Sequence, residues 1–196
     1  MLRNTRDGYG LVAIAFHWTI AALFVVQAAL GFRMSDMEDS LLKLSLYQWH
    51  KSFGLLILVL ALTRLAWRLA NPVPALPETL RPWEKRTARA SHYMLYAGLI
   101  VVPLLGWATV SASPLGVPTL AFYLLYVPHL PVQVGEAAEA ALAATHGALA
   151  TFVAAVALLH VAAALRHHFW LGDDVLRRML RPPRAGRRAV GPMKEP

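Results

Sequence analysis

The 196-residue sequence contains no cysteine and few charged residues. Without thiols, the chain can form no disulfides, no thiolate metal sites and no thioether links to a haem. Charged residues make up 15% of the sequence and apolar residues 57%, whereas soluble domains contain about 25% and roughly 45–50% respectively. This composition argues against an ordinary soluble enzyme, a disordered chain or a nucleic-acid-binding domain, even though the formal net charge is +8.

Four long apolar stretches run through the sequence. A helix needs about 20 mainly apolar residues to cross the core of a bilayer. Such stretches lie at residues 11–32, 49–69, 92–111 and 142–165. A cleaved signal peptide is the alternative for the first stretch, but its apolar run is longer than the roughly 7–15 residues usual in such peptides. We therefore predict an all-α fold, a four-helix transmembrane bundle in contact with membrane lipid.

The positive charge is concentrated at one end of this predicted bundle. Of the 19 Lys and Arg residues, 16 lie in or beside the N-terminus, the second connection and the C-terminal region, and the others are Arg33, Lys43 and Lys51. Because positive residues favour the cytoplasmic side of a membrane, we predict that both termini are cytoplasmic. The asymmetry indicates contact with anionic lipid and no nucleic-acid partner. Residues 1–182 are expected to form the bundle domain, and residues 183–196 a basic, disordered tail.

The third connection, residues 115–131, is apolar and aromatic but is interrupted by Pro118, Pro128 and Pro131. Its longest uninterrupted run, residues 119–127, is too short to span a bilayer. We predict an interfacial segment on the outer face, with its aromatic side chains at the level of the lipid headgroups.

Besides His92, which opens the third predicted span, four histidines lie within the spans, where ionisable residues are costly and usually functional. The 14 residues from His146 to His160 turn a helix by about 1400°, roughly 40° short of four turns, and cover about 21 Å. Both imidazoles therefore lie on one face, near opposite ends of the span. His17 matches His160 in depth, and His50 matches His146. The sequence predicts two histidine pairs stacked across the bilayer.

Facing imidazoles can fill both axial positions of a haem iron, an arrangement suited to electron transfer. The two pairs therefore favour two haems. The alternative is a haem-free structural or transport protein in which the four histidines form separate hydrogen bonds. Zinc would need three or four converging ligands, and the two pairs are too far apart to form one such site.

At these histidines the sequence resembles the prokaryotic cytochrome b561 family. The matching segments are His17-Trp18, the run His50-Lys51-Ser52-Phe53-Gly54, the run Ser91-His92-Tyr93, and the stretch from His146 through 160–170. The resemblance covers about residues 8 to 182, and its specificity lies in the combination of these segments.

This resemblance implies two non-covalent haems b in a bacterial inner membrane. One would be held by His17 and His160 near the cytoplasm, and the other by His50 and His146 near the periplasm. It also implies electron transfer between a periplasmic donor, such as superoxide, and ubiquinone or another quinone. The b-type subunits of formate dehydrogenases and nickel–iron hydrogenases share this plan. A membrane anchor for such a complex, with a redox partner subunit, is therefore the alternative.

Two further groups of residues are predicted to act near the haems. Basic side chains at suitable depth are expected to contact the haem propionates, unless they extend to the headgroups instead. These residues are Arg33, Lys51, Arg64, Arg68 and Arg89. Histidine titrates near neutral pH and can hold a quinone oxygen and relay a proton. The candidates for that role are His92, His167 and His168, for which an ordinary interfacial or solvated position is the alternative.

Overall fold

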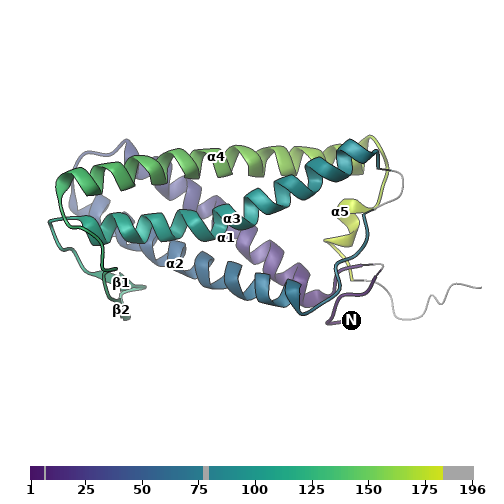
Figure 1. The fold of residues 1–196 in the computed structure, drawn as a ribbon, viewed down its shortest axis with the longest axis horizontal. Coiled ribbons are helices and arrows are strands. Elements are labelled where there is room, and N and C mark those ends of the chain that lie inside the picture. The colour runs from purple at the N-terminus through teal and green to yellow at the C-terminus, as the bar shows by residue number, and fades with distance from the viewer. Residues whose placement is uncertain (7, 77–79, 183–196) are drawn as a thin grey trace, which may run out of the picture.

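The computed structural model describes residues 1–6, 8–76 and 80–182. Four long helices dominate it, with a small hairpin at one end and a short fifth helix at the other (Figure 1). The elements in chain order are α1 (Leu11–Ser35), α2 (Leu41–Leu69), α3 (Pro82–Ala112), β1 (Thr119–Ala121), β2 (Leu125–Val127), α4 (Glu136–Phe169) and α5 (Val175–Arg178). The tail predicted at residues 183–196 lies outside the described residues.

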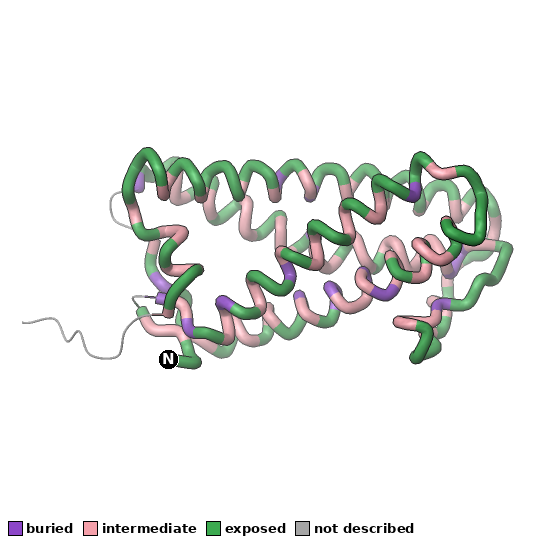
Figure 2. Tube along the Cα trace, turned by 180° about the vertical axis from the view of Figure 1, so that it is seen from behind, coloured by how far each residue is buried: buried purple, intermediate pink, exposed green. Residues whose placement is uncertain are grey.

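The four long helices confirm the predicted fold class. They contain 25 to 34 residues, and each includes an apolar window long enough to cross a membrane. Figure 2 shows that their outward faces are exposed, and these faces carry large apolar side chains such as Val25, Val59, Val101 and Leu158. Apolar surface of this extent is typical of helices that face lipid. The protein is a multi-pass membrane protein.

Three of the helices begin several residues before the predicted spans. The second begins at Leu41, where the Ser40 hydroxyl accepts a hydrogen bond from the backbone N–H of Lys43. The third begins at Pro82, a residue favoured in the first helical turn, and the Glu84 carboxylate accepts a hydrogen bond from the Arg81 N–H. The predicted spans covered only the most apolar stretch of each helix, so they left out these first turns, in which charged or polar residues such as Lys43 and Glu84 are interspersed.

A belt of buried apolar residues fills the middle of the bundle. It comprises Ile20, Ile57, Ala61, Gly98, Val153 and Val156. The closest approach lies between α3 and α4, because a Cβ added to Gly98 would lie 2.4 Å from Cγ2 of Val153. Small residues allow such close packing of transmembrane helices. Val153 is seven residues from both His146 and His160, so the belt separates the two predicted histidine levels.

The connection between α3 and α4 forms an antiparallel hairpin, where we had predicted only an interfacial segment. At its turn, Phe122 and Tyr123 both have positive φ, 53° and 58°, as the type I′ turns of tight hairpins require. Two buried serine hydroxyls hold the connection: Ser52 accepts the Phe122 N–H at 2.8 Å, and Ser111 accepts the Leu130 N–H at 2.9 Å. We call this end of the molecule the hairpin end.

The opposite end, which we call the α5 end, is closed by residues 170–182. The Trp18 indole donates a hydrogen bond to the Met179 carbonyl at 2.7 Å. The Arg178 guanidinium donates to the Ala75 carbonyl at 2.8 Å. These contacts hold α5 against α1 and against the connection between α2 and α3, beside the N-terminus (Figure 1).

Candidate functional site

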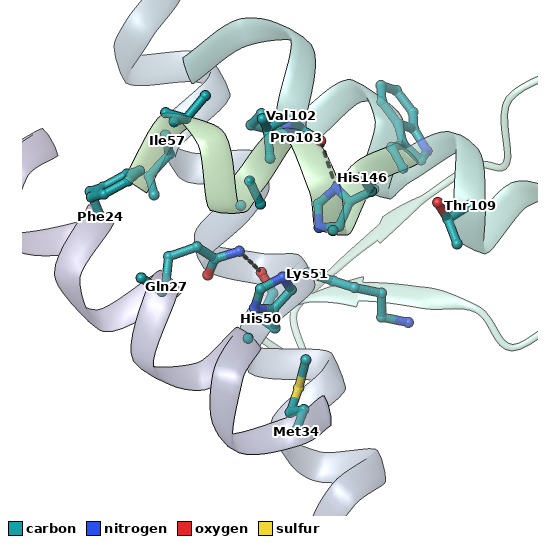
Figure 3. A pocket seen from close by; sticks show the side chains of 18 of the residues that line it. Phe24, Gln27, Met34, His50, Lys51, Ile57, Val102, Pro103, Thr109 and His146 are labelled. Atoms are coloured by element: carbon teal, nitrogen blue, oxygen red, sulfur yellow. Dashed lines mark hydrogen bonds between the residues drawn. The ribbon is translucent and has the colours of Figure 1, made fainter. Parts of the chain in front are cut away.

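His50 of α2 and His146 of α4 face each other at the hairpin end. Their ring centroids are 6.2 Å apart, and their planes are inclined by 81°. Both side chains border a cavity of about 480 Å³ that is lined by all four long helices (Figure 3). Small-molecule sites typically occupy about 300–1,000 Å³ and are mostly apolar. The cavity therefore has the size and the lining of a cofactor site.

The hydrogen bond made by His146 fixes the orientation of its ring. The Nδ1 atom donates to the carbonyl of Val102 on α3 at 3.0 Å, as Figure 3 shows. Gly106 permits this approach, since a Cβ there would lie 3.0 Å from Cε1 of His146. In a neutral imidazole with a proton on Nδ1, the lone pair of Nε2 is free to bind a metal.

His50 is positioned by α1. A Cβ on Gly31 would lie 3.3 Å from Cε1 of His50. Gln27, one turn earlier on α1, donates from Nε2 to the His50 carbonyl at 3.0 Å. Within the described part of the chain, the buried Nδ1 of His50 has no hydrogen-bond partner. The two facing imidazoles, for which Gly31 and Gly106 make room, and the mainly apolar cavity beside them fit the haem that we predicted between His50 and His146.

One side of this cavity is polar. Lys51 borders it and donates from Nζ to the Pro118 carbonyl at 3.1 Å. The buried Thr119 hydroxyl borders it as well and has no partner among the described residues. Arg33 is exposed and does not border the cavity. Of the two basic residues predicted for this level, the structure brings only Lys51 to the cavity wall.

Three histidines gather at the α5 end. The His17 ring of α1 lies 6.4 Å from the His160 ring of α4, the predicted partner. His92 of α3 lies closer to His160, at 5.3 Å. Across residues 1–6, 8–76 and 80–182, no group of three or more His, Asp or Glu is arranged to hold a metal ion. The sequence placed His92 at this end of its span but gave no sign that it contacts His160.

Arg64 occupies the side of His17 that faces α2. Its NH2 group lies 3.2 Å from Nδ1 of His17. A guanidinium can only donate, so Nδ1 accepts, and the proton of the neutral ring is on Nε2. If His17 is to bind iron through Nε2, its proton must move to Nδ1. Arg64 must then leave Nδ1 for another partner.

The other basic residues predicted for this level lie around Tyr96. The guanidinium groups of Arg64 and Arg68, one helical turn apart, stack over the Tyr96 ring at 5.3 and 5.6 Å. A small cavity of about 50 Å³ is lined by Arg68, Arg89, His92, Tyr93 and Tyr96. The sequence analysis did not include Tyr93 and Tyr96 among the site residues. Nothing in their sequence positions distinguishes them from other aromatic residues at the end of a span.

His167 and His168 have different surroundings. Nδ1 of His167 lies 2.6 Å from the carboxylate of Asp173, and both side chains are largely buried. His167 is thus engaged in holding residues 170–175 against α4. The ring of His168 packs on Phe169, and its buried Nδ1 has no partner among the described residues. The two histidines thus differ at Nδ1, which is paired with a carboxylate in His167 and has no such partner in His168.

Comparisons with known proteins confirm the family resemblance seen in the sequence. A family model described as prokaryotic cytochrome b561 matches residues 8–182. The chain is 34% identical over 185 residues to "Cytochrome b561 homolog 2" of Escherichia coli (strain K12), with 90% of this chain and 93% of the relative covered. It is 30% identical over 172 residues to "Probable superoxide oxidase CybB" of Yersinia pestis, with 88% and 95% covered. It is 27% identical over 182 residues to "Cytochrome b562" of Cereibacter sphaeroides, with 90% and 98% covered.

Proposed function

Since the chain belongs to the prokaryotic cytochrome b561 family, and is thus a b-type haem protein of electron transfer, we propose that it carries electrons through two haems. The electrons would pass from a periplasmic donor to the membrane quinone pool. The observation that carries this proposal is the pair of facing histidines at each end of the bundle. Among the described residues, the Lys and Arg on the α5 side far outnumber those on the hairpin side, which favours a cytoplasmic α5 end and a periplasmic hairpin end in a bacterial inner membrane.

At the hairpin end, we assign His50 and His146 as the residues that would hold the haem iron. A haem held by two imidazoles supplies a reversible one-electron couple without an open position for oxygen. The Val102 carbonyl keeps the His146 proton on Nδ1 and so directs Nε2 toward the cavity. Lys51 stands at the polar wall, where its ammonium group suits an anionic propionate.

At the α5 end, we assign His17 and His160. The contact between Arg64 and His17 is compatible with this assignment if Arg64 turns to a propionate, an anionic partner that suits a guanidinium better than an imidazole nitrogen does. His17 can then carry its proton on Nδ1 and present Nε2. Arg68 and Arg89 border the same region and complete the set of cations proposed to balance the propionates.

The donor that we propose is a small periplasmic reductant. Superoxide is the one named in the description of the Yersinia pestis relative. Its single excess electron matches the one-electron chemistry of a haem that has both axial positions filled. Parallel assays with superoxide, quinol and ascorbate would rank the donors by the rate at which each reduces the protein.

The first test is the amount and the type of haem bound. We expect two haems b per chain, because there are two facing histidine pairs, and we expect acid-acetone to extract both, because the chain has no cysteine. The measurements are haem content per chain and the reduced-minus-oxidised visible spectrum. One haem per chain, or a haem that resists extraction, would contradict the proposal.

A second test addresses the quinone end. We expect His168→Ala to slow quinone reduction by roughly 100-fold, the usual contribution of a positioned proton donor. Both haems should remain, and a soluble donor should still reduce the hairpin-end haem rapidly. Asp173→Asn is the control, since it weakens the His167 contact that holds residues 170–175 and leaves His168 in place. Normal quinone turnover in a triple alanine variant of His92, His167 and His168 would move the quinone site to the hairpin end.

A further inference from the structure

Two buried polar atoms at the hairpin end have no hydrogen-bond partner within the described residues. They are Oε1 of Gln27 and Nδ1 of His50. A buried polar group that lacks a partner loses its hydrogen bonds to water without replacement, which destabilises the fold. The two groups are complementary, because an amide oxygen accepts and an imidazole N–H donates.

These two atoms belong to side chains that already touch. Nε2 of Gln27 donates to the His50 carbonyl at 3.0 Å, as Figure 3 shows. The edge of the His50 ring with Cε1 and Nδ1 faces α1, since a Cβ on Gly31 would lie 3.3 and 3.9 Å from these atoms. Gly31 is one helical turn beyond Gln27 and lies on the same face of α1. The Gln27 amide and the Nδ1 edge therefore border the same strip of α1.

The Gln27 amide can approach α2 because the position that it contacts, Gly54, has no side chain. A Cβ on Gly54 would lie 3.1 Å from Nε2 of Gln27. Glycine at this position leaves room for the amide to reach the backbone of α2. The Gln27 amide of α1 therefore lies against the backbone of α2, at Gly54 and at the His50 carbonyl.

His50 and His146 differ in what their Nδ1 atoms contact. Nδ1 of His146 donates to the Val102 carbonyl, whereas His50 has no equivalent backbone partner in the part of the chain that the structure describes. Histidines that bind metals usually donate their second ring N–H to a carbonyl or a carboxylate. The amide oxygen of Gln27 can accept a hydrogen bond in the same way as a backbone carbonyl.

We propose that Gln27 is the positioning residue for His50: its Nε2 holds the His50 backbone, and its Oε1 accepts the proton of His50 Nδ1. Forming this bond would take a rotation of the imidazole that leaves Nε2 of Gln27 on the His50 carbonyl. The bond fixes the tautomer that leaves Nε2 of His50 free for iron. This inference rests on the proposed haem at the hairpin end.

The expected effect of this bond is on the reduction potential of that haem. An acceptor on Nδ1 raises the basicity of the imidazole, and a more basic ligand stabilises ferric over ferrous iron. Gln27→Leu should therefore shift the hairpin-end haem to a higher potential and leave the α5-end haem unchanged. Gln27→Glu retains an oxygen acceptor and should have the wild-type potential or a lower one.

A matched control lies on α2. Gln48 also has a buried Oε1 without a partner among the described residues, and its Nε2 also donates to a backbone carbonyl, that of Pro118, at 3.1 Å. Its amide contacts the hairpin connection, away from the backbone of His50. Gln48→Leu removes an equivalent amide and should leave both haem potentials unchanged.

The experiment is a redox titration of the visible spectrum of the full chain, with haem content measured for each variant. We expect at least a tenfold change in the reduction equilibrium for Gln27→Leu, or about 59 mV for one electron. A wild-type potential in this variant, or an equal shift in Gln48→Leu, would overturn the inference. If Gln27→Leu loses the haem, retention in Gln27→Glu supports the inference, and loss in both overturns it. A wild-type spectrum in His50→Ala would instead overturn the proposed function.

Discussion

Replacing His50 or His146 with alanine is expected to remove the hairpin-end haem completely and to leave the α5-end haem in place. The two rings face each other at 6.2 Å beside a cavity of about 480 Å³ that all four long helices line. In the part of the chain that the structure describes, no third histidine borders that cavity, and Lys51, which does, is held at the Pro118 carbonyl. Loss of one imidazole therefore leaves the iron without one of its two protein ligands.

The matching variants at the α5 end should give the opposite result. We expect His17→Ala and His160→Ala to remove only the α5-end haem. Haem content would fall from two to one per chain in all four variants, and low-temperature spectra would show which component is lost. His129→Ala, in the connection after the hairpin, is the control and should retain both haems. If His50→Ala and His17→Ala abolished the same spectral component, the assigned pairs would be wrong.

A variant of His92 tests which histidine lies opposite His160 as a ligand at the α5 end. Its ring is closer to His160 than the ring of His17 is, at 5.3 Å against 6.4 Å. Under our assignment, His92→Ala retains the α5-end haem. Loss of that haem in His92→Ala, together with its retention in His17→Ala, would show that His92 is the ligand opposite His160.

The second large effect is expected at Gly98. An added methyl group would lie 2.4 Å from Cγ2 of Val153, and the stiff, β-branched valine cannot turn away freely. Gly98→Ala should therefore force α3 and α4 apart and lower the free energy of unfolding by about 1–3 kcal/mol, the usual cost of overpacking. Denaturation of the purified protein in detergent, followed by its haem absorbance, would measure the change.

A double-mutant cycle distinguishes a clash between residues 98 and 153 from a destabilisation that Gly98→Ala would cause without Val153. Val153→Ala removes the methyl groups that the added Cβ would meet, so the variant with both changes should regain most of the stability that Gly98→Ala loses. The coupling energy is expected to be favourable and about 1 kcal/mol or more. Strictly additive effects would mean that α3 and α4 do not approach each other at these two residues.

The two histidine levels could be predicted from the places of the histidines in their spans and from the 14-residue interval between His146 and His160, which puts both on one face of an α-helix. The additional neighbours of each ring depend instead on how the different helices are rotated about their axes. For this reason the contact of His92 with His160 and that of Arg64 with His17 appear only in the structure.

The role of His167 could not be predicted for a related reason. Its partner Asp173 is six residues away, beyond the end of α4, and a straight helix would carry it far from His167. The chain instead turns back at Gly172, where φ is +66°, and brings the two side chains together at 2.6 Å. Helix periodicity contains no information about such a reversal, so we had treated His167 as a free donor.

The belt between the two histidine levels has an electrical consequence. Its buried apolar side chains, centred on Gly98 and Val153, contain no group that could carry a proton alongside an electron. The levels are about 21 Å apart along α4, roughly two-thirds of a hydrocarbon core of about 30 Å. An electron that moves from the hairpin end to the α5 end thus works against about two-thirds of the membrane potential, or roughly 1.5 kcal/mol per 100 mV. In the proposed orientation each turnover is electrogenic, and an energised membrane slows it.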